Sequence, residues 1–346
     1  MELSNIQFQA DDFQFANQAA KADKIQEYEK PSALKSFLEI FSRNKGAVFG
    51  AIVISLIILM AIIGPMISGY DPNHQTIGHE SMAPRIQGLE KLGIFDGSVT
   101  LTTSTGSMTI NKYETAQNAQ DVYYWFGTDS LGRDIFTRTW MGTRLSLYIA
   151  LIAVLVDVLI GMTYGLASGY FGGRVDMVMQ RLIEIINGIP NLVVVTLLIV
   201  VMKPGITSIT IAIALTGWIG MSRVARAQML KLREREFVLA AHTLGASPLY
   251  LIFKEILPNI FAQLIIMSMF SIPSAIFTEA FLAFIGLGVP LPQASLGSLI
   301  SDSFKSFLVS PYMIIPPVLV LSLTMLSFNL LADGLRDALD PTMKEI

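Results

Sequence analysis

The chain has 346 residues, of which 52% are apolar and only 15% are charged, and its net charge is -3. This composition argues against two or three soluble domains, because soluble chains carry more charge. The sequence has no cysteine, which excludes a disulfide framework, a thiolate metal site and a cysteine nucleophile. We expect no cleaved signal peptide, because a polar segment of mixed charge precedes the first apolar run.

Apolar runs of membrane-spanning length recur along the chain. A helix needs roughly 20 residues to cross the hydrocarbon core. Five uncharged runs are about that long: Ala47–Tyr70, Ile185–Met202, Pro204–Ser222, Ile256–Thr278 and Ser306–Ala332. A further run, Leu145–Gly173, contains one acid, Asp157. The sequence therefore predicts an all-α integral membrane protein with six transmembrane helices.

The basic residues predict which side each segment faces. If residues 1–45 are cytoplasmic and the six spans alternate, 16 of the 24 Lys and Arg residues lie inside, in that tail, near Arg174–Arg181, in 223–254 and in the C-terminal tail. The short external loops carry only Lys203 and Lys305. Both termini are therefore expected in the cytoplasm, by the positive-inside rule.

The tail before the first span contains a predicted amphipathic helix at about 33–44. Its apolar residues recur at helical spacing: Leu34, Phe37, Leu38 and Phe41. Ser32 is a candidate cap, and Gly46 lies near the expected bend into the bilayer. Two alternatives remain open, a helix lying on the inner leaflet or one packed on neighbouring spans.

The remaining segments follow in order. They are a first span at 46–70, an external segment at 71–143, a core of five spans at 144–335 that includes the cytoplasmic stretch 223–258, and a C-terminal tail at 336–346. In the external segment, Val99, Leu101, Met108 and Ile110 alternate with polar residues around a turn, which predicts a β-hairpin. This external insert is either a docking element or a solvated loop without a specific role.

The cytoplasmic stretch EFVLAAHTLGASPLYLIFKEILPN has a helix-turn-helix pattern. We expect a short helix over Glu236–Leu244, ended by Gly245 in the left-handed conformation. Ser247 and Pro248 would cap and start a second helix, and Pro258 would mark the entry to the next span. A DNA-reading role is disfavoured, because no isolated basic face is present.

This stretch resembles the cytoplasmic coupling loop of ABC importer permeases, whose pattern is Glu-Ala-Ala, three residues, Gly, nine residues and Ile-x-Leu-Pro. The positions that fit are Ala240, Ala241, Gly245, Leu257 and Pro258. The sequence departs from the pattern at Leu239, which replaces the glutamate, and at Glu255, which replaces the isoleucine.

Other stretches resemble the smaller-type permease subunit of dipeptide, oligopeptide and nickel importers. They are GTDSLGRDIFTRTWMGTRLSL (127–147), GYFGGRVDMVMQR, FLAFIGLGVPLPQASLGSLISD and FNLLADGLRDALDP. The first carries the signature residues Gly127, Thr128, Asp129, Gly132, Arg133 and Asp134. The resemblance covers nearly all of Lys35–Pro341 and implies the type I importer permease fold.

The resemblance implies a multi-pass subunit of an ATP-driven importer in a bacterial cell membrane. Its implied partners are a second permease, two cytoplasmic ATPases and an external solute-binding lipoprotein, with no nucleic acid. ATP and Mg would bind the partner ATPases, and this chain would hold no cofactor or metal and catalyse nothing. On one point the residues agree independently. A Walker A nucleotide site needs Gly-Lys and the chain has no such dipeptide, so we expect the energy to come from another polypeptide or from an ion gradient.

The substrate and the energy source leave alternatives open. Oligopeptides are favoured, since the spans lack a histidine cluster for nickel, but nickel and dipeptides remain alternatives within the family. His74 and His79 are expected to be solvated loop residues. From another class, an ion-coupled secondary transporter would use Asp157 and Glu279 as a proton relay. Each of these acids either lines a pathway or gate, or makes a helix–helix polar contact or is protonated.

Overall fold

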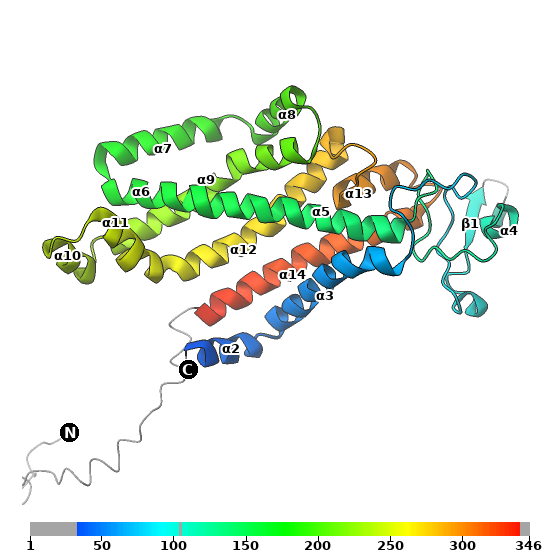
Figure 1. Cartoon of the computed structure of the whole chain (residues 1–346), viewed down its shortest axis with the longest axis horizontal. Helices are drawn as coiled ribbons and strands as arrows, with labels where there is room; N and C mark the ends of the chain where they lie inside the picture. The colour runs from blue at the N-terminus through cyan, green and yellow to red at the C-terminus, as the bar shows by residue number, and fades with distance from the viewer. Residues whose placement is uncertain (1–32, 104–105, 340–346) are drawn as a thin grey trace, which may run out of the picture.

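The computed structural model describes residues 33–103 and 106–339. Long helices lie side by side along the longest dimension of the molecule, and an irregular subdomain with a β-hairpin covers one end of the bundle (Figure 1). Helix α10 lies at the opposite end. Within the described ranges, five helical segments are long and apolar enough to cross a membrane, or six if one bent pair counts as a span. This confirms the predicted all-α membrane fold.

Asn44 separates the first two helices, α2 (Ala33–Arg43) and α3 (Lys45–Ile67). Its side-chain Oδ1 accepts a hydrogen bond from the Ala47 amide at 3.1 Å, which caps α3. Its Nδ2 donates to Asp337 Oδ2 at 2.9 Å. The break is therefore at this asparagine rather than at Gly46, and the predicted cap at Ser32 lies outside the described residues.

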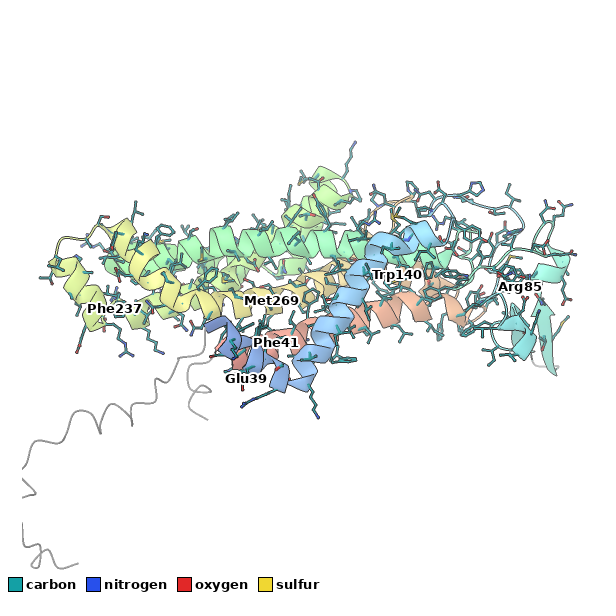
Figure 2. All side chains as sticks on the ribbon, turned by 60° about the horizontal axis from the view of Figure 1, so that its bottom comes forward. Glu39, Phe41, Arg85, Trp140, Phe237 and Met269 are labelled. Carbon is teal, nitrogen blue, oxygen red and sulfur yellow. The ribbon has the colours of Figure 1, made fainter. Side chains whose placement is uncertain are left out.

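Helix α2 packs against the last helix, α14 (Ile315–Leu339). Phe37 and Phe41 stack with ring centroids 6.0 Å apart, and Phe41 lies close to Gly334 of α14. Figure 2 shows Phe41 on the side of α2 toward α14, with Glu39 on the outer side. Leu38 is 54% exposed. Of the two alternatives for this helix, packing on a neighbouring span is the one observed.

The second span is a continuous helical segment of 37 residues. It comprises α5 (Ile135–Val156), a π-helical turn η3 (Asp157–Met162) and α6 (Thr163–Phe171). Helix α5 therefore begins inside the segment 71–143 that the sequence analysis expects to be external. Asp134 ends the preceding loop and caps the helix.

Three glycines four residues apart allow α6 and η3 to approach α9 (Ile206–Leu232) closely. A Cβ atom on Gly161 would stand 2.5 Å from the carbonyl oxygen of Trp218, and one on Gly165 would stand 2.1 Å from that of Ser222. Gly169 faces Met229 in the same way. Small residues at this spacing let helix backbones meet in membranes, and our sequence analysis did not use this signal.

The third predicted span is bent. Helices α7 (Gly173–Gly188) and α8 (Asn191–Met202) meet at 77°. Pro190 explains the bend, because the residue before a proline is driven out of the helical region, and Ile189 has extended angles, φ -88° and ψ 128°. The uncharged run Ile185–Met202 therefore contains a bend, and the range Arg174–Arg181 before it lies in α7.

The second half of the chain consists of α9, the short α10 (Glu236–Thr243) and two further long segments. The first runs from Pro248 to Leu287 over 40 residues. Its parts are α11 (Pro248–Tyr250), the π-helical turn η4 (Leu251–Ile256), α12 (Leu257–Leu282) and the π-helical turn η5 (Ala283–Leu287). After α13 (Leu296–Lys305), the 3-10 turn η6 (Pro311–Met313) leads into α14.

The subdomain at the other end of the bundle contains the predicted β-hairpin. Strands β1 (Ser98–Thr103) and β2 (Gly106–Asn111) are antiparallel, with Val99 opposite Ile110 and Leu101 opposite Met108. The predicted hairpin is therefore confirmed, although residues 104–105 of its turn lie outside the described ranges. Two short helices flank it, η2 (Glu90–Leu92) and α4 (Lys112–Thr115).

Aromatic side chains form the core of this subdomain, and His79 belongs to it. The imidazole is buried, with Nδ1 2.9 Å from Tyr124 Oη and Nε2 3.1 Å from the Gln117 carbonyl oxygen. The prediction of a solvated loop histidine is therefore wrong for His79, because its two ring nitrogens find partners inside the fold. His74 is exposed, as expected. Burial also raises the pKa of the nearby Tyr113.

Candidate functional site: the α10 turn, the signature turn and a central cavity

Gly245 ends α10 in the way the sequence predicts. Its φ is +87°, and its amide donates to the His242 carbonyl at 3.0 Å, while the Ala246 amide donates to the Ala241 carbonyl at 3.1 Å. These two bonds define a Schellman motif, which ends a helix and satisfies its last carbonyls. A Cβ atom at Gly245 would meet nothing within 4 Å, so the backbone conformation, and not crowding, requires the glycine.

Ser247 and Pro248 begin the next helix as predicted. The Ser247 hydroxyl accepts a hydrogen bond from the Tyr250 amide at 3.3 Å, and Pro248 occupies the first turn. Pro258 lies in the first turn of α12. The helix continues through it, directly after the π-helical turn η4. A proline in a helix removes one hydrogen bond and crowds the preceding turn. The wider π-helical turn η4 lies at that place and relieves the crowding.

Helix α10 presents most of its surface outward. Val238 is its single buried residue and belongs to a cluster with Leu251, Ile252 and residues of α6 and α9. Glu236, Ala240 and Leu239 are exposed, Ala241 is half-buried, and Leu244 is 88% exposed. An exposed apolar surface on a small helix is typical of a site that contacts another protein, while Val238 joins this helix to the bundle.

The signature residues at the other end form a tight turn around Asp129. Its Oδ1 accepts hydrogen bonds from the amides of Leu131 and Arg133 at 2.9 and 3.0 Å. Its Oδ2 pairs with Arg133 Nε at 2.7 Å and lies 3.5 Å from Arg138 Nε. Because Arg138 is also buried and donates to the Pro72 carbonyl at 2.9 Å, the turn joins the loop after α3 to α5.

Glycine is required twice in this signature. Gly127 and Gly132 have φ of +79° and +71°, and a Cβ atom on either would stand within 2.4 Å of a backbone oxygen, of Met82 or Thr76 respectively. Thr128 is fully buried, and its hydroxyl accepts from the Met82 amide at 2.8 Å. These contacts explain the motif as a structural joint between the subdomain and the second span.

Asp134 caps α5 and completes this joint. Its Oδ2 accepts from the Thr137 amide at 2.8 Å and from the Thr137 hydroxyl at 2.6 Å. Burial raises the pKa of the Asp134 carboxyl, and the hydrogen bonds from Thr137 oppose that shift. The signature residues are thus brought together by the fold, but around one another and not around an open site.

Asp157 faces a central cavity of about 450 Å³. The cavity lies between η3, the bend that joins α7 to α8, α9 and α12, and its walls include Asn187, Asn191 and Ser271. The Asp157 side chain is buried, and its Oδ1 has no hydrogen-bond partner among the described residues. It lies at the first residue of a π-helical turn, a feature found frequently at functional sites.

Glu279 has a different environment, although both acids were expected in one pathway. It is fully buried on α12, and its Oε2 accepts a hydrogen bond from the Ser146 hydroxyl of α5 at 2.9 Å. It does not line the cavity that Asp157 faces. The contact corresponds to the helix–helix polar alternative, and the structure does not bring the two carboxylates together in one relay.

Gly217 is the neighbour of Asp157 that our sequence analysis missed. A Cβ atom on this α9 glycine would stand 3.1 Å from Asp157 Oδ1, so the missing side chain lets α9 approach the carboxylate closely. A glycine in an apolar span was the available signal, because glycine in a membrane helix often marks a close approach. Its partner, however, depends on how α5 and α9 pack.

These features define a transmembrane component of a transport system, and comparisons with known proteins agree. Residues 158–345 match the family model "Binding-protein-dependent transport system inner membrane component", and residues 32–84 match "N-terminal TM domain of oligopeptide transport permease C". The chain therefore belongs to the family of binding-protein-dependent transport system inner membrane components, the ABC importer permeases.

Individual relatives cover nearly the whole chain. The oligopeptide transport system permease protein OppC of Bacillus subtilis is 40% identical over 95% of this chain and 96% of that protein. The dipeptide transport system permease protein DppC of Lactococcus lactis is 40% identical over 94% and 95%. Among solved structures, the inward-facing MetNI methionine ABC transporter shares 12% identity, with a TM-score of 0.48 over 57% of this chain and 95% of that one.

Proposed function

We propose that this chain is one of two permease subunits of an ATP-driven importer of oligopeptides. The observation that carries the proposal is the 40% identity over nearly full length to an oligopeptide permease. A dipeptide permease is equally similar, so dipeptides form the second candidate class. The partner permease would complete the pathway, and the chain itself would bind no ATP.

The α10 turn is the proposed contact with the ATPases. It lies at the end of the bundle opposite the hairpin, and the stretch 223–254 that contains it carries six Lys and Arg residues. The positive-inside rule favours this end as cytoplasmic. Leu239 and Leu244 offer an exposed apolar surface, and Val238 is placed to transmit movement to the buried cluster shared with α6, α9 and α12.

The opposite end would face the exterior and receive the solute-binding protein. The subdomain is held to the second span by the buried signature turn around Asp129 and Arg138. A rigid connection of this kind suits alternating access, in which the helical bundle switches between two conformations. Binding of the solute-binding protein at one end and ATP-driven closure of the ATPases at the other would shift the same equilibrium. ATP and Mg would act on the ATPase subunits alone.

Reconstitution tests the proposal. The chain is placed in vesicles with the second permease, the ATPases and the binding protein of its own transporter, and uptake of a labelled oligopeptide, a labelled dipeptide and nickel is measured with and without ATP. We expect ATP-dependent uptake of the oligopeptide, and none by the chain alone. Uptake of nickel but not of the oligopeptide would contradict the proposed substrate class. Uptake by the lone chain that an uncoupler abolishes would support an ion-coupled transporter.

A further inference from the structure

The cavity at Asp157 has the properties of a site for a cation. Asp157 is the one charged group among the described residues that line it. It lies near the middle of the apolar run Leu145–Gly173, which places it deep in the predicted membrane span. The other polar residues of the wall are uncharged, and they are Asn187, Asn191, Thr216, Ser271 and Ser274, with Thr278 further along α12.

The carboxyl group of Asp157 lines this cavity together with Ser271 of α12. Asp157 is 5% exposed, and its Oδ1 has no hydrogen-bond partner among the described residues. An unpaired carboxylate in a membrane is costly, on the order of 3 kcal/mol on insertion scales. Gly217 lets α9 approach this oxygen closely, because a Cβ atom there would stand only 3.1 Å from it. A ligand in the cavity would supply the missing partner.

An ammonium group fits these requirements. It carries one positive charge and three donors, so it can pair with the Asp157 carboxylate and use neighbouring side-chain oxygens for its other protons. The α-amino group of a peptide has a pKa of about 7.7–8.0 and is largely charged at neutral pH. Every peptide with a free N-terminus carries this group whatever its side chains, and a volume of about 450 Å³ suits a small ligand or the end of a longer one.

We propose that Asp157 binds the N-terminal ammonium group of a peptide as the peptide crosses the membrane. The inference rests on the proposed function, because it requires that peptides pass this cavity. Gly217 is a positioning residue, because its missing side chain lets α9 lie against the carboxylate, and the uncharged polar wall accepts peptides of varied sequence. Ion pairing in a site of low dielectric is stronger than in water, which favours a free N-terminus over a blocked one.

Cysteine labelling of the assembled transporter tests the charge of the site. The chain has no native cysteine, so Ser274→Cys places a single thiol of this chain in the cavity wall. Labelling rates are compared for a cationic aminoethyl and an anionic sulfonatoethyl methanethiosulfonate, each normalised to Thr243→Cys on exposed α10. We expect the cationic reagent to be favoured by roughly tenfold or more, given the attraction between unit charges a few ångströms apart.

Variants at Asp157 and Gly217 decide the outcome. Asp157→Asn should bring the normalised ratio of the cationic to the anionic labelling rate close to one. Asp157→Glu should retain most of the preference for the cationic reagent, and Gly217→Ala should lower that preference. An unchanged ratio in Asp157→Asn would overturn the proposal, as would a Ser274→Cys thiol that the neutral methyl reagent cannot reach. Because Gly217→Ala keeps the carboxyl group, it tests the site even if Asp157→Asn fails to assemble.

A second experiment, with added peptides, tests the identity of the ligand. Trialanine at millimolar concentration should protect Ser274→Cys from the neutral reagent at least severalfold better than N-acetyl-trialanine, and Asp157→Asn should remove the difference. Equal protection by both peptides would overturn the inference. ATP-driven uptake of trialanine by the wild-type transporter is measured alongside. Its absence would contradict the proposed function, while the reagent ratio would still report whether the cavity attracts cations.

Discussion

Arg226 of α9 donates two hydrogen bonds to the carboxylate of Asp176 on α7, from Nε and from Nη2, each 2.6 Å long. The same carboxylate accepts a hydrogen bond from Ser168 of α6. Three helices that lead toward α10 therefore meet at one ion pair. Bidentate pairs of this type fix orientation as well as distance, so this contact is suited to move α7 and α9 together.

The first prediction concerns this pair. Arg226→Lys should lower the melting temperature of the purified chain, because lysine cannot reproduce two parallel contacts. We expect a cost of about 1 kcal/mol, since the arginine side chain is 30% exposed and solvent screens part of the interaction. Asp176→Asn and the double variant complete a cycle measured by thermal melting. Additive effects would show that the two residues are not coupled.

The second prediction concerns Gly245. Replacing it with valine should leave membrane insertion intact and uncouple ATP hydrolysis from uptake, because a β-branched residue is strained at a φ of +87°. The cost for an L-residue in this region is roughly 1–2 kcal/mol, and Gly245→Asn should be milder since asparagine tolerates left-handed backbone. Uptake and ATPase rates of the assembled transporter give the measurement. Normal uptake by the valine variant would contradict the importance of this turn.

The third prediction separates docking from folding at α10. Leu244→Asp should weaken co-purification of the ATPase without lowering the melting temperature of the chain, because Leu244 is 88% exposed. The matched control is Val238→Ala, which removes a buried side chain and should cost about 1–3 kcal/mol. A loss of stability in Leu244→Asp, or unchanged ATPase binding, would count against a docking surface here.

A crosslinking experiment gives the fourth prediction. A cysteine in place of Ala241, the only cysteine of this chain, should form a crosslink to an ATPase subunit in the assembled transporter when a short bifunctional reagent is added. Thr100→Cys on the hairpin at the opposite end is the control and should not reach that subunit. Capture of lipid alone, or of the same chain alone, would contradict the assignment of α10.

The sequence predicts the local elements of this fold well. The Gly245 turn, the Ser247 cap and the presence of the hairpin all follow from short-range rules, in which one residue type satisfies one backbone requirement. Their geometry is confirmed because neighbours along the chain determine it. The bend at Pro190 also follows from a local rule, because a proline drives the residue before it out of the helical region.

Long-range packing explains the remaining differences between the structure predicted from the sequence and the one observed. Nothing near His79 in the sequence shows that Tyr124 and Gln117 would surround its ring. Likewise, Asp157 and Glu279 are similar as isolated acids in apolar runs, and only the packing of α5, α9 and α12 gives one a cavity and the other a serine partner. The sequence of a membrane helix shows that a charged residue must be accommodated inside the protein. The helices packed against it determine how that residue is accommodated.

The fifth prediction tests the glycine contact between α6 and α9. Gly165→Ala should destabilise the bundle and reduce the yield of folded protein, because the added Cβ would stand 2.1 Å from the Ser222 carbonyl oxygen. Relief requires the helix backbones to separate, and overpacking of this kind typically costs about 1–3 kcal/mol. Gly188→Ala is the matched control, since a Cβ there meets nothing within 4 Å and alanine is the better helix former. Thermal melting in detergent compares the two. Equal melting temperatures would show that α6 and α9 do not meet as closely as the glycine spacing requires.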